Sequence, residues 1–156
     1  MNIKIIALGK LKETFLKEGA VEFLKRLKPY AGIEIIELSP IEIPDENSVG
    51  KILDKEAEKI LAHIKPQSYV ITLEITGEML SSVDFAQKIK HIINTGAGEI
   101  VFIIGSSCGL SSVVSRRADF KLSLSKMTFL HQFTRLILLE QIYRAFKILS
   151  GETYHK

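Results

Sequence analysis

Short apolar runs recur along the chain and predict strands. Five such runs stand out, at residues 3–8, 33–38, 69–75, 100–104 and 120–124. β-Branched residues are prominent in the first four, as is typical of strands, and the run at 100–104 is continuously apolar. A continuous run indicates a strand that is buried on both faces.

Helical periodicity fills most of the gaps between these runs. Apolar residues recur every three or four positions over about 16–27, 49–64, 83–93 and 132–149. Several boundaries carry a proline, a capping serine or a glycine, namely Pro29, Pro66, Ser81, Ser82, Gly96 and Gly151. Residues 39–48 contain two prolines and are expected to form a mobile loop.

The alternation of strands and helices predicts an α/β fold. A parallel connection needs a crossover of a dozen or more residues, which the helical segments supply. We therefore expect a single domain over residues 1–156, with a parallel sheet and helices on both of its faces.

Composition agrees with a globular protein. The 156 residues are 46% hydrophobic and 25% charged, which excludes a disordered or collagen-like chain. One cysteine cannot form an internal disulfide, and neither a secretory signal nor an apolar run of about 20 residues is present. A cytoplasmic protein with no membrane segment is the expectation.

Ligands of open parallel sheets bind beyond the carboxyl ends of the strands. That rule points to residues 9–10, 76–78, 105–109 and 125–129.

The loop at 105–109 reads Gly-Ser-Ser-Cys-Gly, which fits the nucleophile elbow of serine hydrolases with Ser107 at its centre. Asp119 and His131 would then complete a triad. The same loop can also be a simple tight turn, with Cys108 a small packed residue.

The four histidines, at positions 63, 91, 131 and 155, have no metal-ligand spacing, so we expect no metal.

The formal charge of +3 is concentrated at one end of the chain. From Lys126 onward there are five basic and two acidic side chains, whereas the two signs balance before it. The basic residues can contact RNA, although Glu140 and Arg144 also have the spacing of an intrahelical ion pair. The helix at 132–149 is apolar around most of its circumference, which suggests a dimer interface.

Long-spaced motifs over essentially the whole chain resemble the RlmH (YbeA) family of ribosomal RNA methyltransferases. The matching segments are 5–12 (Ile-Ile-Ala-Leu-Gly-Lys-Leu-Lys), 26–30 (Arg-Leu-Lys-Pro-Tyr), 73–77 (Leu-Glu-Ile-Thr-Gly), 123–129 (Ser-Leu-Ser-Lys-Met-Thr-Phe), 140–145 (Glu-Gln-Ile-Tyr-Arg-Ala) and 154–156 (Tyr-His-Lys). Two positions depart from the family pattern, where Ser106 replaces a glycine and Leu130 replaces a proline.

The resemblance implies a SPOUT-class fold, in which the C-terminal segment forms a trefoil knot, and a homodimer. It implies methyl transfer from S-adenosylmethionine, without a metal, to N3 of a pseudouridine in 23S ribosomal RNA. The residues that it assigns to the cofactor are Leu73, Gly105, Leu124, Ser125, Lys126, Met127, Thr128 and Phe129.

Catalytic and RNA-binding roles are expected near the C-terminus. His131 and Arg135 lie one helical turn apart and are expected to face the target ring and a neighbouring phosphate, with His131 or His155 as the candidate base. Residues expected to hold RNA are Arg144, Tyr154 and Lys156. A net charge of +3 is small for a protein that reads naked RNA, which favours the large subunit or the whole ribosome as substrate. A non-catalytic ribosome-binding module is a further alternative.

Overall fold

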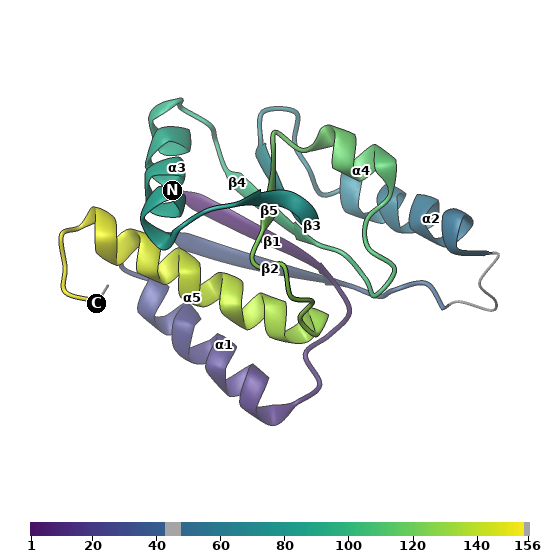
Figure 1. The fold of residues 1–156 in the computed structure, drawn as a ribbon, viewed down its shortest axis with the longest axis horizontal. Coiled ribbons are helices and arrows are strands. Elements are labelled where there is room, and N and C mark those ends of the chain that lie inside the picture. The colour runs from purple at the N-terminus through teal and green to yellow at the C-terminus, as the bar shows by residue number, and fades with distance from the viewer. Residues whose placement is uncertain (43–47, 155–156) are drawn as a thin grey trace.

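The strands form one parallel sheet in the order β2-β1-β4-β3-β5 (Figure 1). The computed structural model describes residues 1–42 and 48–154. Within them the strands are β1 (Asn2–Leu8), β2 (Gly32–Leu38), β3 (Tyr69–Met79), β4 (Ile100–Ile104) and β5 (Phe120–Ser123). The parallel sheet expected from the sequence is confirmed. Residues 43–47, part of the expected loop at 39–48, lie outside the described residues.

Within the described residues the four expected helices are present, together with a fifth, shorter one that was missed. The helices are α1 (Thr14–Leu27), α2 (Val49–Leu61), α3 (Ser82–Asn94), α4 (Ser112–Arg117) and α5 (His131–Leu149). Six residues of α4 are too few to show a helical period, although Ser111 caps it by accepting a hydrogen bond from the Val114 amide. Helix α2 ends before the expected Ile64 because its last turn tightens, with the Ile64 amide donating to the Leu61 carbonyl.

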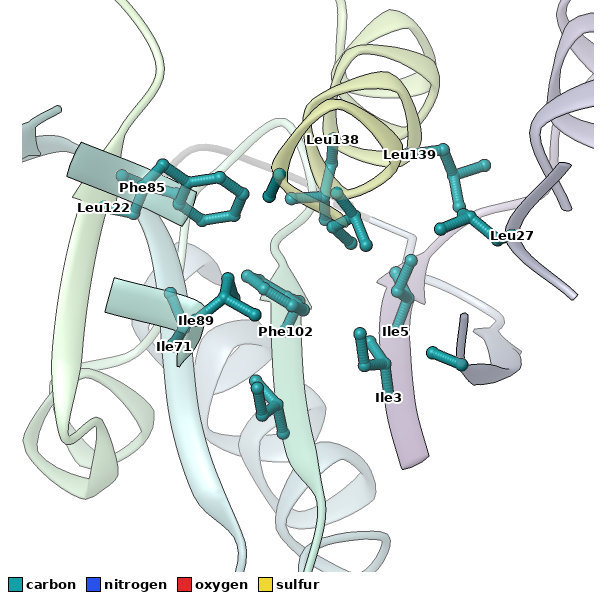
Figure 2. Packing of buried hydrophobic residues seen from close by; sticks show 14 of the residues in the cluster. Ile3, Ile5, Leu27, Ile71, Phe85, Ile89, Phe102, Leu122, Leu138 and Leu139 are labelled. Carbon is teal, nitrogen blue, oxygen red and sulfur yellow. The ribbon is translucent and has the colours of Figure 1, made fainter. Parts of the chain in front are cut away.

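Helices cover both faces of the sheet, as expected. On one face α1, α3 and α5 pack against inward side chains of the strands, and Leu138 and Leu139 of α5 lie over Ile5 and Phe102 (Figure 2). On the other face, α2 and α4 cover a smaller cluster that includes Val101. These two apolar layers explain why the central strands read as continuous apolar runs.

Strand β3 does not end at Ile75, as its apolar run had suggested. Leu73 and Glu78 are both in register with Leu122 of β5, so the residues between them leave the ladder as a bulge. At Gly77 a Cβ atom would lie 2.7 Å from the carbonyl carbon of Leu122, so this close approach requires glycine. The bulge brings a segment of β3 to the carboxyl edge of the sheet.

None of the helices in the described part of the chain is both long and apolar enough to cross a membrane.

Candidate functional site

A cleft of about 790 Å³ lies at the carboxyl edge of the sheet. Three chain segments line it: the bulge of β3 after Leu73, the loop that follows β4, and the loop between β5 and α5. Three of the four loops nominated by the strand-end rule therefore meet at one site. The fourth loop, at Gly9, lies beside the cleft, because a Cβ atom there would be 3.6 Å from Nε2 of His131.

Most of the residues assigned to the cofactor by family resemblance lie in this cleft. The lining includes Leu73, Gly105, Leu124, Ser125, Met127, Thr128 and Phe129. Lys126 differs, since it is exposed and does not line the cleft. An exposed lysine stem gains no packing at such a site and keeps its ammonium in water.

The loop after β4 is a tight turn. The Gly109 amide donates to the Ser106 carbonyl at 2.9 Å, and Gly109 has a φ of +84°. At Gly105 a Cβ atom would lie 2.5 Å from the Gly109 carbonyl oxygen, so the turn closes only over a glycine. Gly105 is therefore required by the fold of the loop itself.

The serine hydrolase alternative does not assemble. A nucleophile elbow needs a strained backbone at its serine, but among the described residues only glycines have positive φ, so Ser107 does not have a left-handed backbone. Asp119 accepts a hydrogen bond from the Val70 amide at 2.8 Å, near the start of β3, and pairs with Arg117. His131 lies at the opposite, carboxyl end of the strands. The loop is thus the tight turn that was the simpler interpretation.

Ser106 is held from outside the cleft by a buried carboxylate. Glu56 of α2 is only 2% exposed. One of its oxygens accepts from the Ser106 hydroxyl at 3.0 Å and the other from the Ile41 amide at 3.2 Å. Sequence reasoning missed Glu56, although it lies one helical turn from both Ile52 and Ile60, on the apolar face of its helix. The sequence did contain a signal for Glu56, namely a charged residue on the apolar face of a predicted helix.

Glu74 was also missed, and it lines the cleft. Its carboxylate accepts hydrogen bonds from the hydroxyls of Thr72 at 2.7 Å and of Ser115 at 3.1 Å. The available signal was a carboxylate inside the apolar run at 69–75, directly before the expected end of the strand.

His131 begins α5 and lines the cleft. Partial burial lowers the pKa of its imidazole below the ordinary 6.5, and the nearby cations Arg135 and Lys12 lower this pKa further. The Lys12 amide donates to the Gln132 side chain at 2.8 Å, which ties this helix end to the loop after β1. His131 is therefore a neutral group at pH 7, able to accept a proton at the edge of the cleft.

Arg135 does not face a substrate as expected. Its side chain is 1% exposed, and its guanidinium donates to Glu37 at 2.6 Å and to the Gly9 carbonyl at 2.8 Å. Burial lowers the pKa of this guanidinium, while Glu37 opposes the shift. The expected contact with an RNA phosphate is thus corrected: Arg135 joins α5 to β2 and to the loop after β1, because a buried cation needs a partner.

The C-terminal basic residues are largely paired. Arg144 forms the intrahelical pair with Glu140 and lies 4.8 Å from the ring centroid of Tyr154, whose hydroxyl donates to Glu140. Lys147 pairs with Glu152. Two residues with expected roles, His155 and Lys156, lie outside the described residues.

Metal binding has no candidate site in the part of the chain that the structure describes. No group of three or more His, Cys, Asp or Glu residues there could hold a metal ion.

Comparisons with known proteins consistently identify methyltransferases, and each match covers nearly the whole of this chain. Residues 1–155 match a family model described as predicted SPOUT methyltransferase. Ribosomal RNA large subunit methyltransferase H of Carboxydothermus hydrogenoformans is 53% identical, and a putative ribosomal RNA large subunit methyltransferase H of Methanococcus maripaludis is 51% identical, each match covering 100% of both chains. A probable methylase family protein from Haemophilus influenzae has a similar structure, with a TM-score of 0.54 and 15% identity, covering 99% of this chain and 70% of that chain. At that identity the likeness shows the fold alone.

Proposed function

Because the chain belongs to the SPOUT methyltransferase family, we propose that it transfers a methyl group from S-adenosylmethionine to N3 of a pseudouridine in 23S ribosomal RNA. Both relatives are named as methyltransferases of large-subunit ribosomal RNA, which supports this RNA as the substrate. The observation that carries the proposal is the cleft at the carboxyl edge, where three separate loops converge around a glycine turn. The pseudouridine base and its N3 position are those that the family resemblance implies.

The cleft suits a cofactor of this size and chemistry. Its volume of about 790 Å³ lies within the usual range of small-molecule sites, and its lining is mainly apolar. The loop after β4 and the segment from Leu124 to Phe129 both line the cleft, so their peptide groups would hold the adenosine part. When bound, S-adenosylmethionine supplies a methyl group that is already activated on a sulfonium. Metal assistance is therefore not needed for the transfer.

His131 takes up the proton that leaves N3, directly or through one water molecule. Its lowered pKa keeps the imidazole neutral and thus able to accept. The interior contacts of Arg135 hold the same helix end in place, so Arg135 is a positioning residue in this mechanism. Holding the acceptor and the methyl donor in line provides much of the rate.

We propose that two copies of the chain together form the complete active site. The single domain, residues 1–156, forms a cytoplasmic homodimer, and its C-terminal segment is threaded as a trefoil knot. Exposed apolar side chains near the start of α5 support an interface there, with Leu130 at 59%, Phe133 at 41% and Phe15 of α1 at 57% exposure. Arg144, Tyr154, His155 and Lys156 contact RNA, and the tail serves the partner subunit's site.

The assembled large subunit or ribosome is the better substrate. The basic residues of α5 are already paired within the chain, so this helix offers few free cations to bare phosphates. Recognition then depends on the shape of a folded particle.

Methyl incorporation into three substrates tests this proposal: naked 23S ribosomal RNA, isolated large subunits and whole ribosomes from cells that lack the gene. Nucleoside mass spectrometry should find one new N3-methylpseudouridine, formed faster on an assembled particle. Binding without methylation would support the ribosome-binding module instead. A methyl group on another base would contradict the proposed specificity.

A further inference from the structure

Among the described residues that line the cleft, Glu74 is the one carboxylate, and none is a lysine or an arginine. His131, the other titratable imidazole or carboxyl group in the lining, is neutral at pH 7 because burial and nearby cations lower its pKa. The cleft therefore carries a single fixed negative charge, surrounded by hydroxyl, backbone and apolar groups.

The Glu74 carboxylate is fixed in position from two elements. Thr72, fully buried in β3, donates to one oxygen, and Ser115 of α4 donates to the other. Each hydroxyl occupies one lone-pair direction of its oxygen, which leaves acceptor capacity on both oxygens. A carboxylate held in this way does not need to be reoriented when a cation enters the cleft.

We propose, resting on the function proposed above, that Glu74 makes the cleft discriminate the cationic methyl donor from its neutral demethylated product. Both molecules carry the same ammonium and carboxylate in the methionine part. They differ in the sulfur, which is a sulfonium in the donor and a neutral thioether in S-adenosylhomocysteine. During transfer the N–C bond forms, the C–S bond breaks with its electron pair left on sulfur, and the N3 proton passes to the base.

The attraction of Glu74 is thus present before transfer and lost after it. Coulomb attraction between unit charges about 4 Å apart corresponds to about fivefold in a binding constant in bulk water and to more in a partly dry cleft, so about tenfold is a lower estimate for the cleft. This difference favours loading of the donor and release of the product, without any movement of the protein.

Binding calorimetry with three ligands tests the proposal independently of activity. The ligands are S-adenosylmethionine, S-adenosylhomocysteine and sinefungin, which has a cationic amine in place of the methylsulfonium. In Glu74→Gln the first and third should bind about tenfold more weakly, whereas S-adenosylhomocysteine should change by less than about twofold. Glu78→Gln is the matched control, because Glu78 lies on the same strand, is exposed and does not line the cleft.

Two further variants separate charge from structure. Glu74→Asp retains the charge and should retain the preference for the cationic ligands. Ser115→Ala removes one hydroxyl donor without changing the charge, and should alter the preference by less than about threefold.

Several outcomes would overturn the proposal. Equal weakening of all three ligands in Glu74→Gln would show that Glu74 binds the shared ammonium, and unchanged binding would show that it does not act on the ligand. If Glu74→Gln does not fold, the unaltered protein decides: its preference for the donor should decline as salt rises from about 0.01 M to 1 M, and a constant preference contradicts the charge effect. Failure of the unaltered protein to bind any of the three ligands would instead refute the proposed function.

Discussion

Removing one partner of the Arg135–Glu37 pair should strongly destabilise the protein. Arg135 is 1% exposed and belongs to α5, whereas Glu37 belongs to β2 and its side chain is 33% exposed. The pair therefore joins the C-terminal helix to the edge strand of the sheet. Glu37→Gln is the cleanest perturbation, because it removes the charge and keeps the size of the side chain.

The magnitude follows from the unequal burial of the two partners. Breaking a buried ion pair by removing one partner costs about 3–5 kcal/mol, because the other charge stays uncompensated. Water reaches Glu37 and replaces part of the lost interaction, so we expect Glu37→Gln to lower the free energy of unfolding by about 2–3 kcal/mol. That is a large part of a typical total of about 5–15 kcal/mol.

A double-mutant cycle provides the test. Arg135→Met removes the buried charge but leaves the Gly9 carbonyl without its donor, at a cost of about 1–3 kcal/mol. With the cation gone, adding Glu37→Gln should cost less than about 0.5 kcal/mol, so the coupling energy should be about 2 kcal/mol. Urea unfolding at a fixed chain concentration measures each free energy. An equal cost of Glu37→Gln in both backgrounds would refute the inference that Glu37 compensates Arg135.

Other consequences concern the cleft. The pKa of His131 in the native protein lies below 6.5, so near pH 6.5 the unfolded chain binds more protons than the native chain does. The free energy of unfolding should therefore fall as the pH drops from above 6.5 through the native pKa. A nuclear magnetic resonance titration should place the inflection of the His131 signal below 6.5. Gly105→Ala should lower the free energy of unfolding by about 1–3 kcal/mol and abolish calorimetric binding of S-adenosylmethionine, because the added Cβ atom would collide with the backbone of Gly109. In contrast, Gly50→Ala should stabilise α2 by up to about 1 kcal/mol, because nothing lies within 4 Å of the Cβ position at Gly50. Glu56→Leu should cost about 1–3 kcal/mol and speed amide exchange around Ser106; unchanged exchange would show that this carboxylate does not hold the loop.

The sheet and its major helices could be predicted because their sequence patterns are local. Each central strand reads as an apolar run, and each long helix repeats its apolar positions over several turns. The bulge of β3 could not be predicted in this way, because it depends on the fit of Gly77 against the backbone of β5, which is more than 40 positions away. A strand end inferred from composition alone was therefore placed too early.

The place of the site followed from topology, and the roles of its charged residues did not. Parallel strands bring their carboxyl ends to one edge, so the loops after β3, β4 and β5 could be nominated without knowing any contact. No comparable rule predicts which residue pairs with a buried charge. Glu37 lies 98 positions from Arg135, and nothing in the sequence indicates that the two meet.

A surplus of basic residues in a segment gives little information about the surface of that segment. The excess after Lys126 suggested an RNA-binding face, yet Arg135 is neutralised in the interior, and Arg144 and Lys147 are paired with carboxylates of their own segment. In the cleft the situation is reversed, since one carboxylate at Glu74 has two hydroxyl donors and no cationic partner among the lining residues. An ion pair is already compensated, whereas this carboxylate still attracts cations. For that reason the electrostatic selectivity of this protein should depend more on Glu74 than on the basic helix that gives the chain its net charge.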